Sequence, residues 1–85
     1  MSFTNKQILE FCNLQMERNK YKYLSLQEGG DNFILCCDVR KLTEDFIFQH
    51  AMDDISENER QAILQAVYQW WKETDYNINN KKFKL

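Results

Sequence analysis

The chain lacks proline entirely and has only two glycines and one histidine among its 85 residues. Because the glycines are adjacent, at Gly29 and Gly30, no glycine-rich phosphate-binding loop can form, which excludes the usual nucleotide-binding motifs. Catalysis of the Ser–His–Asp or Cys–His kind would have to be built on His50. This residue lies in a run of apolar residues, where we expect it at the edge of the core or on the surface. The sequence therefore predicts a protein that is not an enzyme and has no catalytic residues.

Cysteine is also scarce. Cys12, Cys36 and Cys37 are an odd number, without the spacing of a disulfide framework or of a zinc ligand set. We interpret all three as small apolar residues that are buried or half-buried. The acidic stretch 53–59 lacks the glycine that a calcium-binding loop needs at its bend. The sequence thus predicts no metal and no cofactor.

Long hydrophobic runs are missing. No apolar stretch approaches the roughly 18–20 residues that cross a bilayer, and residues 1–4 lead into a polar helix rather than a signal peptide. We therefore expect a protein of the bacterial cytoplasm with no membrane segment. The length predicts one domain over residues 1–85. Residues 77–85 hold three lysines and no acid, and form either a flexible basic tail or a short third strand.

Local signals predict an α+β fold with the element order α-β-β-α-α. Thr4 and Gln7 form a capping box at the start of a helix that should cover about residues 5–19. Thr43 should cap a second helix, which we expect to continue to Ile55. Ser56 and Glu59 form another capping box for a last helix ending near residue 75, and the two final helices should meet in a tight bend.

A β-hairpin is expected between the first and second helices. Residues 21–27 and 32–40 are extended-looking runs, and Gly29-Gly30 supplies the positive φ angles of a two-residue turn. This turn would place Leu26 opposite Phe33 and Leu24 opposite Leu35. That face should lie on the helices, whereas the other face needs a cover or a strand paired at the edge.

Charge is sorted along the chain. Residues 44–76 hold eight acids and two bases, a net charge of −6, although the whole chain carries −2. Such a block favours a basic partner, because its field steers and holds opposite charge. The carboxylates could stand where the phosphates of a nucleic acid would lie, or they could be helix-cap and solvated surface residues. The candidate partner-binding acids are Glu44, Asp45, Asp53, Asp54, Glu57 and Glu59.

Aromatic residues near the end of the last helix are the candidate anchors. Trp70 and Trp71 are adjacent, and a domain this small buries one of them more easily than both. An exposed Trp71 together with Tyr68 would make a good protein-binding anchor, since Trp and Tyr dominate interface energetics. Alternatively, Trp71 covers the second face of the hairpin.

These features favour a non-enzymatic protein that binds a basic or nucleic-acid-binding protein stoichiometrically. One alternative is a nucleic-acid-associated regulator that uses the bases of residues 18–23 and 40–41. The net charge of −2 and the pI of about 5.3 disfavour direct nucleic-acid binding. Another alternative is a structural or immunity-type subunit that forms a homodimer through the open edge of its hairpin.

In size, charge and element order the chain resembles small phage or mobile-element proteins that inhibit host machinery, including some CRISPR-nuclease inhibitors. Its richness in Phe, Tyr, Ile, Asn and Lys, with little Gly, Ala, Arg or Pro, also suggests an AT-rich genome. The resemblance lies in outline and assigns no residue a role. It implies an inhibitor that acts on a nucleic-acid enzyme of a bacterial host.

Overall fold

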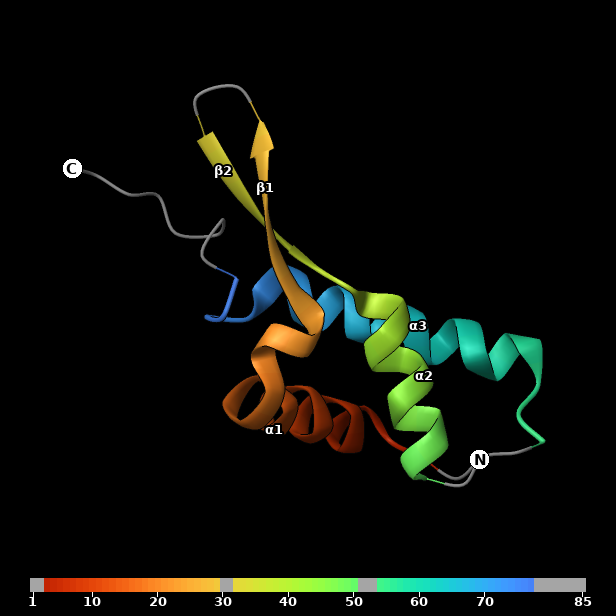
Figure 1. The fold of residues 1–85 in the computed structure, drawn as a ribbon. Coiled ribbons are helices and arrows are strands. Elements are labelled where there is room, and N and C mark those ends of the chain that lie inside the picture. The colour runs from red at the N-terminus through yellow and green to blue at the C-terminus, as the bar shows by residue number, and fades with distance from the viewer. Residues whose placement is uncertain (1–2, 30–31, 51–53, 78–85) are drawn as a thin grey trace.

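Five elements follow one another in the order α-β-β-α-α, which confirms the predicted α+β fold. The computed structural model describes residues 3–29, 32–50 and 54–77 (Figure 1). Within these residues the elements are α1 (Asn5–Tyr23), β1 (Leu24–Gly29), β2 (Asn32–Cys37), α2 (Val39–Gln49) and α3 (Glu57–Glu73). Of the helices described, none is both long and apolar enough to cross a membrane.

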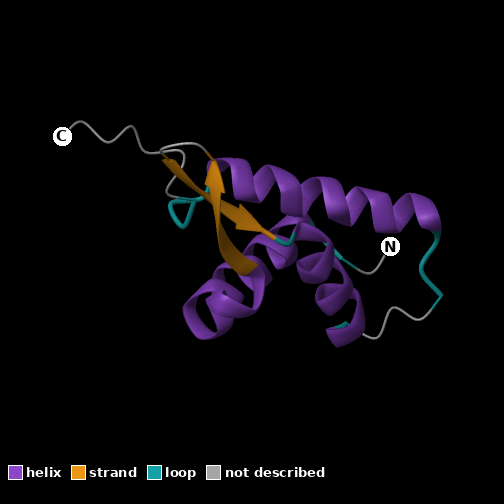
Figure 2. Ribbon diagram, turned by 45° about the horizontal axis from the view of Figure 1, so that its top comes forward, coloured by secondary structure: helices purple, strands orange, loops and turns teal. Residues whose placement is uncertain are grey.

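The three helices form the body of the molecule. α3 packs against both α1 and α2, and α1 also packs against α2. Figure 2 shows α3 lying along one side of the body, with α1 and α2 on the other. The hairpin of β1 and β2 projects from the end of the body where α1 ends and α2 begins (Figure 1). The structure therefore has a helical core with a β-ribbon at one end.

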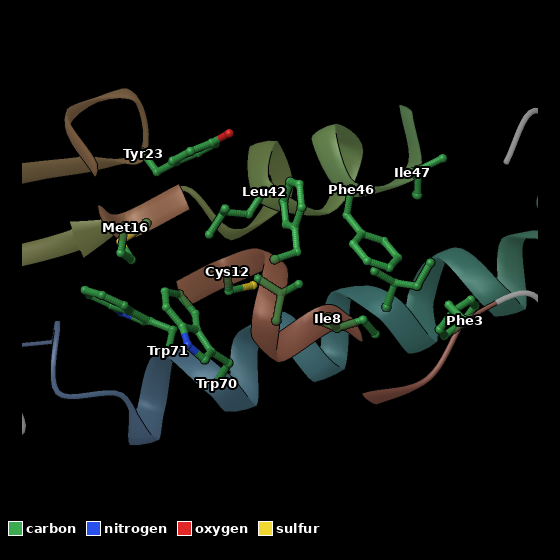
Figure 3. Packing of buried hydrophobic residues seen from close by; sticks show 13 residues of the cluster. Phe3, Ile8, Cys12, Met16, Tyr23, Leu42, Phe46, Ile47, Trp70 and Trp71 are labelled. Carbon is green, nitrogen blue, oxygen red and sulfur yellow. The ribbon is translucent and has the colours of Figure 1, made fainter. Parts of the chain in front are cut away.

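Phe46 of α2 lies at the centre of this core and is fully buried. Its ring makes edge-to-face contacts with Phe3 and Phe11, at centroid distances of 6.2 and 5.4 Å. Apolar side chains from all three helices converge around it (Figure 3). The other fully buried side chains are Ile8, Cys12, Met16, Leu42, Ile63 and Val67.

Both predicted capping boxes are confirmed. The Thr4 hydroxyl accepts a hydrogen bond from the Gln7 amide, and the Gln7 side chain accepts one from the Thr4 amide at 2.7 Å. Ser56 and Glu59 make the same reciprocal pair at the start of α3, where the Glu59 amide donates to Ser56 Oγ at 3.1 Å. These pairs satisfy amide groups that a helix start would otherwise leave without partners.

α1 extends further than predicted. It continues past residue 19 to Tyr23, across a break at Asn19, whose backbone angles (φ −139°, ψ 33°) are not helical. The buried Gln15 side chain accepts a hydrogen bond from the Asn19 amide group at 3.2 Å and supports the break. Because Tyr23 is still helical, β1 begins at Leu24 rather than at residue 21.

The hairpin forms with a different register. Leu26 lies opposite Leu35 and Leu24 opposite Cys37, so the predicted pairing of Leu26 with Phe33 is wrong. The observed register leaves residues 30 and 31 between the strands; these residues lie outside those described. The partner of each β1 residue is displaced by two positions along β2, and because side chains alternate with a period of two, no side chain changes face. Leu24, Leu35 and Cys37 still pack against the core, as predicted.

α2 begins and ends earlier than predicted. Asp38, at the end of β2, is the N-cap and accepts a hydrogen bond from the Lys41 amide at 3.0 Å. Thr43 is therefore not a cap but a buried residue inside the helix, where its hydroxyl donates to the Val39 carbonyl oxygen at 2.7 Å. Starting at Val39 aligns Val39, Leu42 and Phe46 on the face toward the core.

The junction between α2 and α3 is not the predicted tight bend. α2 ends at Gln49, with His50 as its C-cap, and residues 50–56 connect it to α3. The His50 ring stacks on Phe46 with centroids 4.1 Å apart, which places this histidine at the edge of the core. At the other end of α3, the buried Asn77 side chain donates to the Trp71 carbonyl oxygen at 2.9 Å. Asn77 is the first residue of the predicted basic tail or third strand (residues 77–85) and is held against α3; residues 78–85 lie outside those described.

The Ser56 capping box provides a test of these local interactions. We expect Ser56→Ala to lower the free energy of unfolding by about 1 kcal/mol, because the first turn of α3 loses its cap. Ser25→Ala on the exposed part of β1 is the control and should change stability by less than about 0.5 kcal/mol. Urea unfolding followed by tryptophan fluorescence measures both. Equal stability of the two variants would contradict a stabilising role for the cap.

Candidate functional site

Asp45, one of the six candidate acids, is used inside the fold. Its Oδ2 accepts a hydrogen bond from the Tyr23 hydroxyl at 2.6 Å and lies 2.9 Å from Lys22 Nζ. Lys22 and Tyr23 belong to the turn of α1 that follows the break at Asn19, so this turn carries both partners to α2. Asp45 therefore joins α1 to α2 and is not available as a free anionic group.

The same contacts change two pKa values. Burial of Asp45 by itself would raise its pKa, but the hydrogen bond from Tyr23 and the ion pair with Lys22 outweigh it and hold the pKa below its ordinary value of 3.8. Burial, and then the hydrogen bond and negative charge of Asp45, raise the pKa of Tyr23. The pair is thus held as a carboxylate and a neutral phenol.

Two further candidate acids have intramolecular partners. The Glu44 carboxylate forms an ion pair with the Arg60 guanidinium and connects the exposed sides of α2 and α3. Glu59 closes the capping box with Ser56 at the start of α3. For Glu59 this bears out the helix-cap interpretation. Glu44 and Asp45 lie in the middle of α2, so helix-dipole arguments based on a start at Thr43 do not apply to them.

Asp54 and Glu57 are the acids left exposed at the start of α3. Glu57 accepts a hydrogen bond from the Gln61 side chain at 3.1 Å. Within the described part of the chain, no lysine or arginine lies within ion-pair distance of Asp54 or Glu57. The remaining candidate, Asp53, lies outside the described residues. Of the candidate acids described, Asp54 and Glu57 are therefore the two with neither an ion pair nor a capping contact; at the other end of α3, Glu73 and Asp75 are also exposed without a described ion pair.

One exposed face of α3 links this charge to an aromatic residue. Glu57 and Tyr68 are eleven residues apart, about three turns, so their side chains point in nearly the same direction. Gln61 lies between them and is also exposed. The Lys72 ammonium sits 4.6 Å from the centre of the Tyr68 ring. We call Glu57, Gln61 and Tyr68, together with the exposed Asp54 that precedes the helix, the α3 face; only the first three are placed on one side by helical spacing.

Trp71 does not belong to this surface. It is only 9% exposed and packs in the core, so the prediction of an exposed Trp71 anchor is wrong. Trp70 is buried as well, and its indole N–H donates to the Asn13 side chain at 2.9 Å. Both residues enter the core from α3 (Figure 3). Nor does Trp71 cover the second face of the hairpin, where Ile34 is 50% exposed.

Two aromatic residues outside the candidate partner-binding set are highly exposed. Phe48 and Tyr21 are each 85% exposed, Phe48 near the end of α2 and Tyr21 just after the break in α1. The exposure of Phe48 follows from the observed start of α2 at Val39, which turns Phe46 inward and directs Phe48 away from the core. The exposure of Tyr21 does not follow from the sequence prediction, which places this residue in a strand.

The thiols offer little chemistry in the native state. Burial raises the pKa of Cys12 to about 12 and that of Cys37 to about 12, so neither forms a thiolate readily. Cys36 is half-buried and points to the outer face of the hairpin. Across the described residues, no group of three or more His, Cys, Asp or Glu side chains could hold a metal ion.

Comparison with protein-family models, curated proteins and solved structures yields no match to this chain.

Asp45 predicts a specific pH dependence of stability. A carboxylate whose pKa is lowered by folding stabilises the protein above its unfolded pKa, and this contribution disappears as the pH falls through the lower folded value. We expect Asp45→Asn to cost about 1–3 kcal/mol at neutral pH. The difference from wild type should shrink below about pH 5. Urea titrations across pH measure it, with the exposed Glu28→Gln as control; a difference that is constant down to acid pH would contradict the interpretation.

The thiols should react in two classes. At about pH 8 a disulfide reagent such as DTNB should modify Cys36 rapidly, and modify Cys12 and Cys37 only after unfolding, because burial suppresses their thiolates. The variant Cys36→Ser should lose the rapid phase. Persistence of that phase in Cys36→Ser would show that a core thiol is accessible.

Proposed function

We propose that this protein is a non-enzymatic binding protein that acts stoichiometrically on a basic, nucleic-acid-binding protein. The observation that carries the proposal is the exposed start of α3, where Asp54 and Glu57 have no cationic partner among the described residues, and where Tyr68 lies on the same side of the helix as Glu57. Carboxylates steer and orient a basic partner, and an exposed tyrosine supplies apolar contact.

The acids differ in whether they have partners within the fold, and this difference supports the assignment. Glu44, Asp45 and Glu59 are tied to partners within the fold. Asp54 and Glu57 lie at the start of a helix, where the helix dipole by itself favours acids. The dipole alone therefore does not require a partner protein. Their exposure means that a basic surface could reach them without breaking an internal ion pair. We therefore assign the binding role to these two acids rather than to the whole acidic segment.

Inhibition is the form of binding that we propose. A face that presents carboxylates can occupy a groove whose lysines and arginines normally hold phosphates, and thereby exclude nucleic acid. The outline resemblance to phage and mobile-element inhibitors favours a nucleic-acid enzyme of the bacterial cytoplasm, such as a CRISPR nuclease, as the target. Direct nucleic-acid binding by the α3 face is disfavoured, because its charge repels phosphates.

The test compares affinity capture by wild type and by variants from lysate of a low-GC bacterium, with and without nuclease treatment. The double variant Asp54→Asn/Glu57→Gln and the single variant Tyr68→Ala should each retain the fold and recover about tenfold less of the captured protein than wild type. Glu10→Gln/Glu28→Gln removes the same charge from exposed sites elsewhere and should capture as wild type does.

The captured protein should be basic, and its nucleic-acid-dependent activity should be abolished by an equimolar amount of this protein. Capture that disappears after nuclease treatment would contradict the proposal, because it would show attachment through nucleic acid. Equal losses in the two double variants would also contradict it, since they would show that only total charge matters.

A further inference from the structure

An apolar groove lies at the base of the hairpin, away from the acidic start of α3. Its volume is about 510 Å³. Leu24 and Leu26 of β1 and Leu35 of β2 line it, with Tyr21 from α1 and Tyr76 from the segment after α3. Leu26 is 61% exposed, although it belongs to the hairpin face that elsewhere packs on the core. This part of the face is left without a cover among the described residues.

A second, more polar hollow of about 350 Å³ adjoins the groove and shares Lys20 and Tyr21 with it. Arg18, Lys20 and Lys22 line it, together with Glu17. In a regular helix consecutive side chains point about 100° apart and could not line one hollow. The break at Asn19 removes this constraint, so three cations gather beside the apolar groove.

Two of these cations are uncommitted to carboxylates. Lys22 is paired with Asp45. In contrast, no carboxylate of the described residues lies within ion-pair distance of Arg18 or Lys20. Lys20 Nζ lies 5.2 Å from the centre of the exposed Tyr21 ring, at the boundary between the two hollows. An apolar surface is thus flanked on one side by available positive charge, while Asp75 lies on its rim.

We propose that the two hollows form one docking site for an acidic peptide segment of a partner protein. A large apolar side chain of the segment lies on Leu24, Leu26 and Leu35, and a neighbouring carboxylate meets Arg18 and Lys20. Charge complementarity selects this occupant, because the cations at the boundary need an anion and the groove needs an apolar group. The site carries charge opposite to that of the α3 face and does not depend on the proposed function.

Single-stranded nucleic acid is the other polyanion that such a surface could attract. It binds by stacking successive bases on aromatic platforms in a positively charged groove. Here Tyr21 and Tyr76 line the groove beside three leucines, but Asp75 stands at its rim, Glu17 lines the adjoining hollow, and the protein carries a net charge of −2. These features favour a peptide.

The experiment is selection of a displayed library of random peptides of about 12 residues on the full-length protein, with binding of the selected peptides measured by fluorescence anisotropy. Selected peptides should share a large apolar residue next to Asp or Glu, and should bind more weakly as salt increases. Leu26→Ser and Lys20→Glu should each reduce affinity about tenfold.

Each variant has a matched control. Ile34→Ser changes a residue of similar exposure on the opposite face of the hairpin. Lys6→Glu is the control for Lys20→Glu, because it makes the same charge reversal at the far end of α1. Tyr68→Ala is the control for Tyr21→Ala, because each tyrosine has a lysine ammonium over its ring. All three controls should bind the selected peptides as wild type does, whereas Tyr21→Ala should not.

Three results would overturn the proposal. One is selection of no peptides, or of peptides without acids. Another is binding of a labelled oligothymidylate that Leu26→Ser and Lys20→Glu abolish, which would assign the site to nucleic acid. The third is peptide binding that appears only in the full-length variant Phe83→Ser/Leu85→Ser, which would make this chain's own C-terminal segment the occupant. If the α3-face variants did not affect partner capture, the proposed function would fail, but the three results named here would still decide the peptide site independently.

Discussion

The hydrogen bond between Tyr23 and Asp45 holds together the part of the molecule on which the rest depends. Two junctions of the chain lie next to this hydrogen bond: the one between α1 and β1, and the one between β2 and α2. The Asp38 amide donates to the Tyr23 carbonyl oxygen at 2.8 Å, which fixes the two ends of the hairpin to each other. The hydrogen bond from the Tyr23 hydroxyl then connects these paired ends of the hairpin to Asp45 of α2. Since Phe46 follows Asp45, the same contact orients the helix that carries the centre of the core.

This arrangement separates charge within a small protein. Asp45 pairs with Lys22, and Glu44 pairs with Arg60, so the first two acids of the acidic segment are compensated within the fold. Negative charge without a described ion-pair partner remains at both ends of α3, at Asp54 and Glu57 and at Glu73 and Asp75, and positive charge remains around the break in α1. The two proposed binding surfaces have opposite charge because the fold places their residues on different helices. A partner for one is therefore unsuited to the other.

Signals that act over three or four residues were predictable from the sequence. Both capping boxes form as expected, because each depends on a pair of side chains within one turn. The hairpin faces were also predictable, since alternation fixes them even when the register moves. The start of α2, the break at Asn19 and the burial of Trp71 were not. Each depends on a partner distant in sequence: the core that receives Val39 and Leu42, the Tyr23–Asp45 contact, and the packing of α3 on α1. The sorting of the acids into paired and unpaired residues depends on the same contacts.

A double-mutant cycle on Tyr23 and Asp45 tests the central claim most directly. The free energies of unfolding of wild type, Tyr23→Phe, Asp45→Asn and the double variant give the coupling energy between the two side chains. We predict a favourable coupling of about 1–3 kcal/mol at neutral pH, as expected for a partly buried hydrogen bond to a carboxylate. A coupling energy of zero would show that the two residues act independently, and would contradict the role assigned to this contact in joining the hairpin to the helical core.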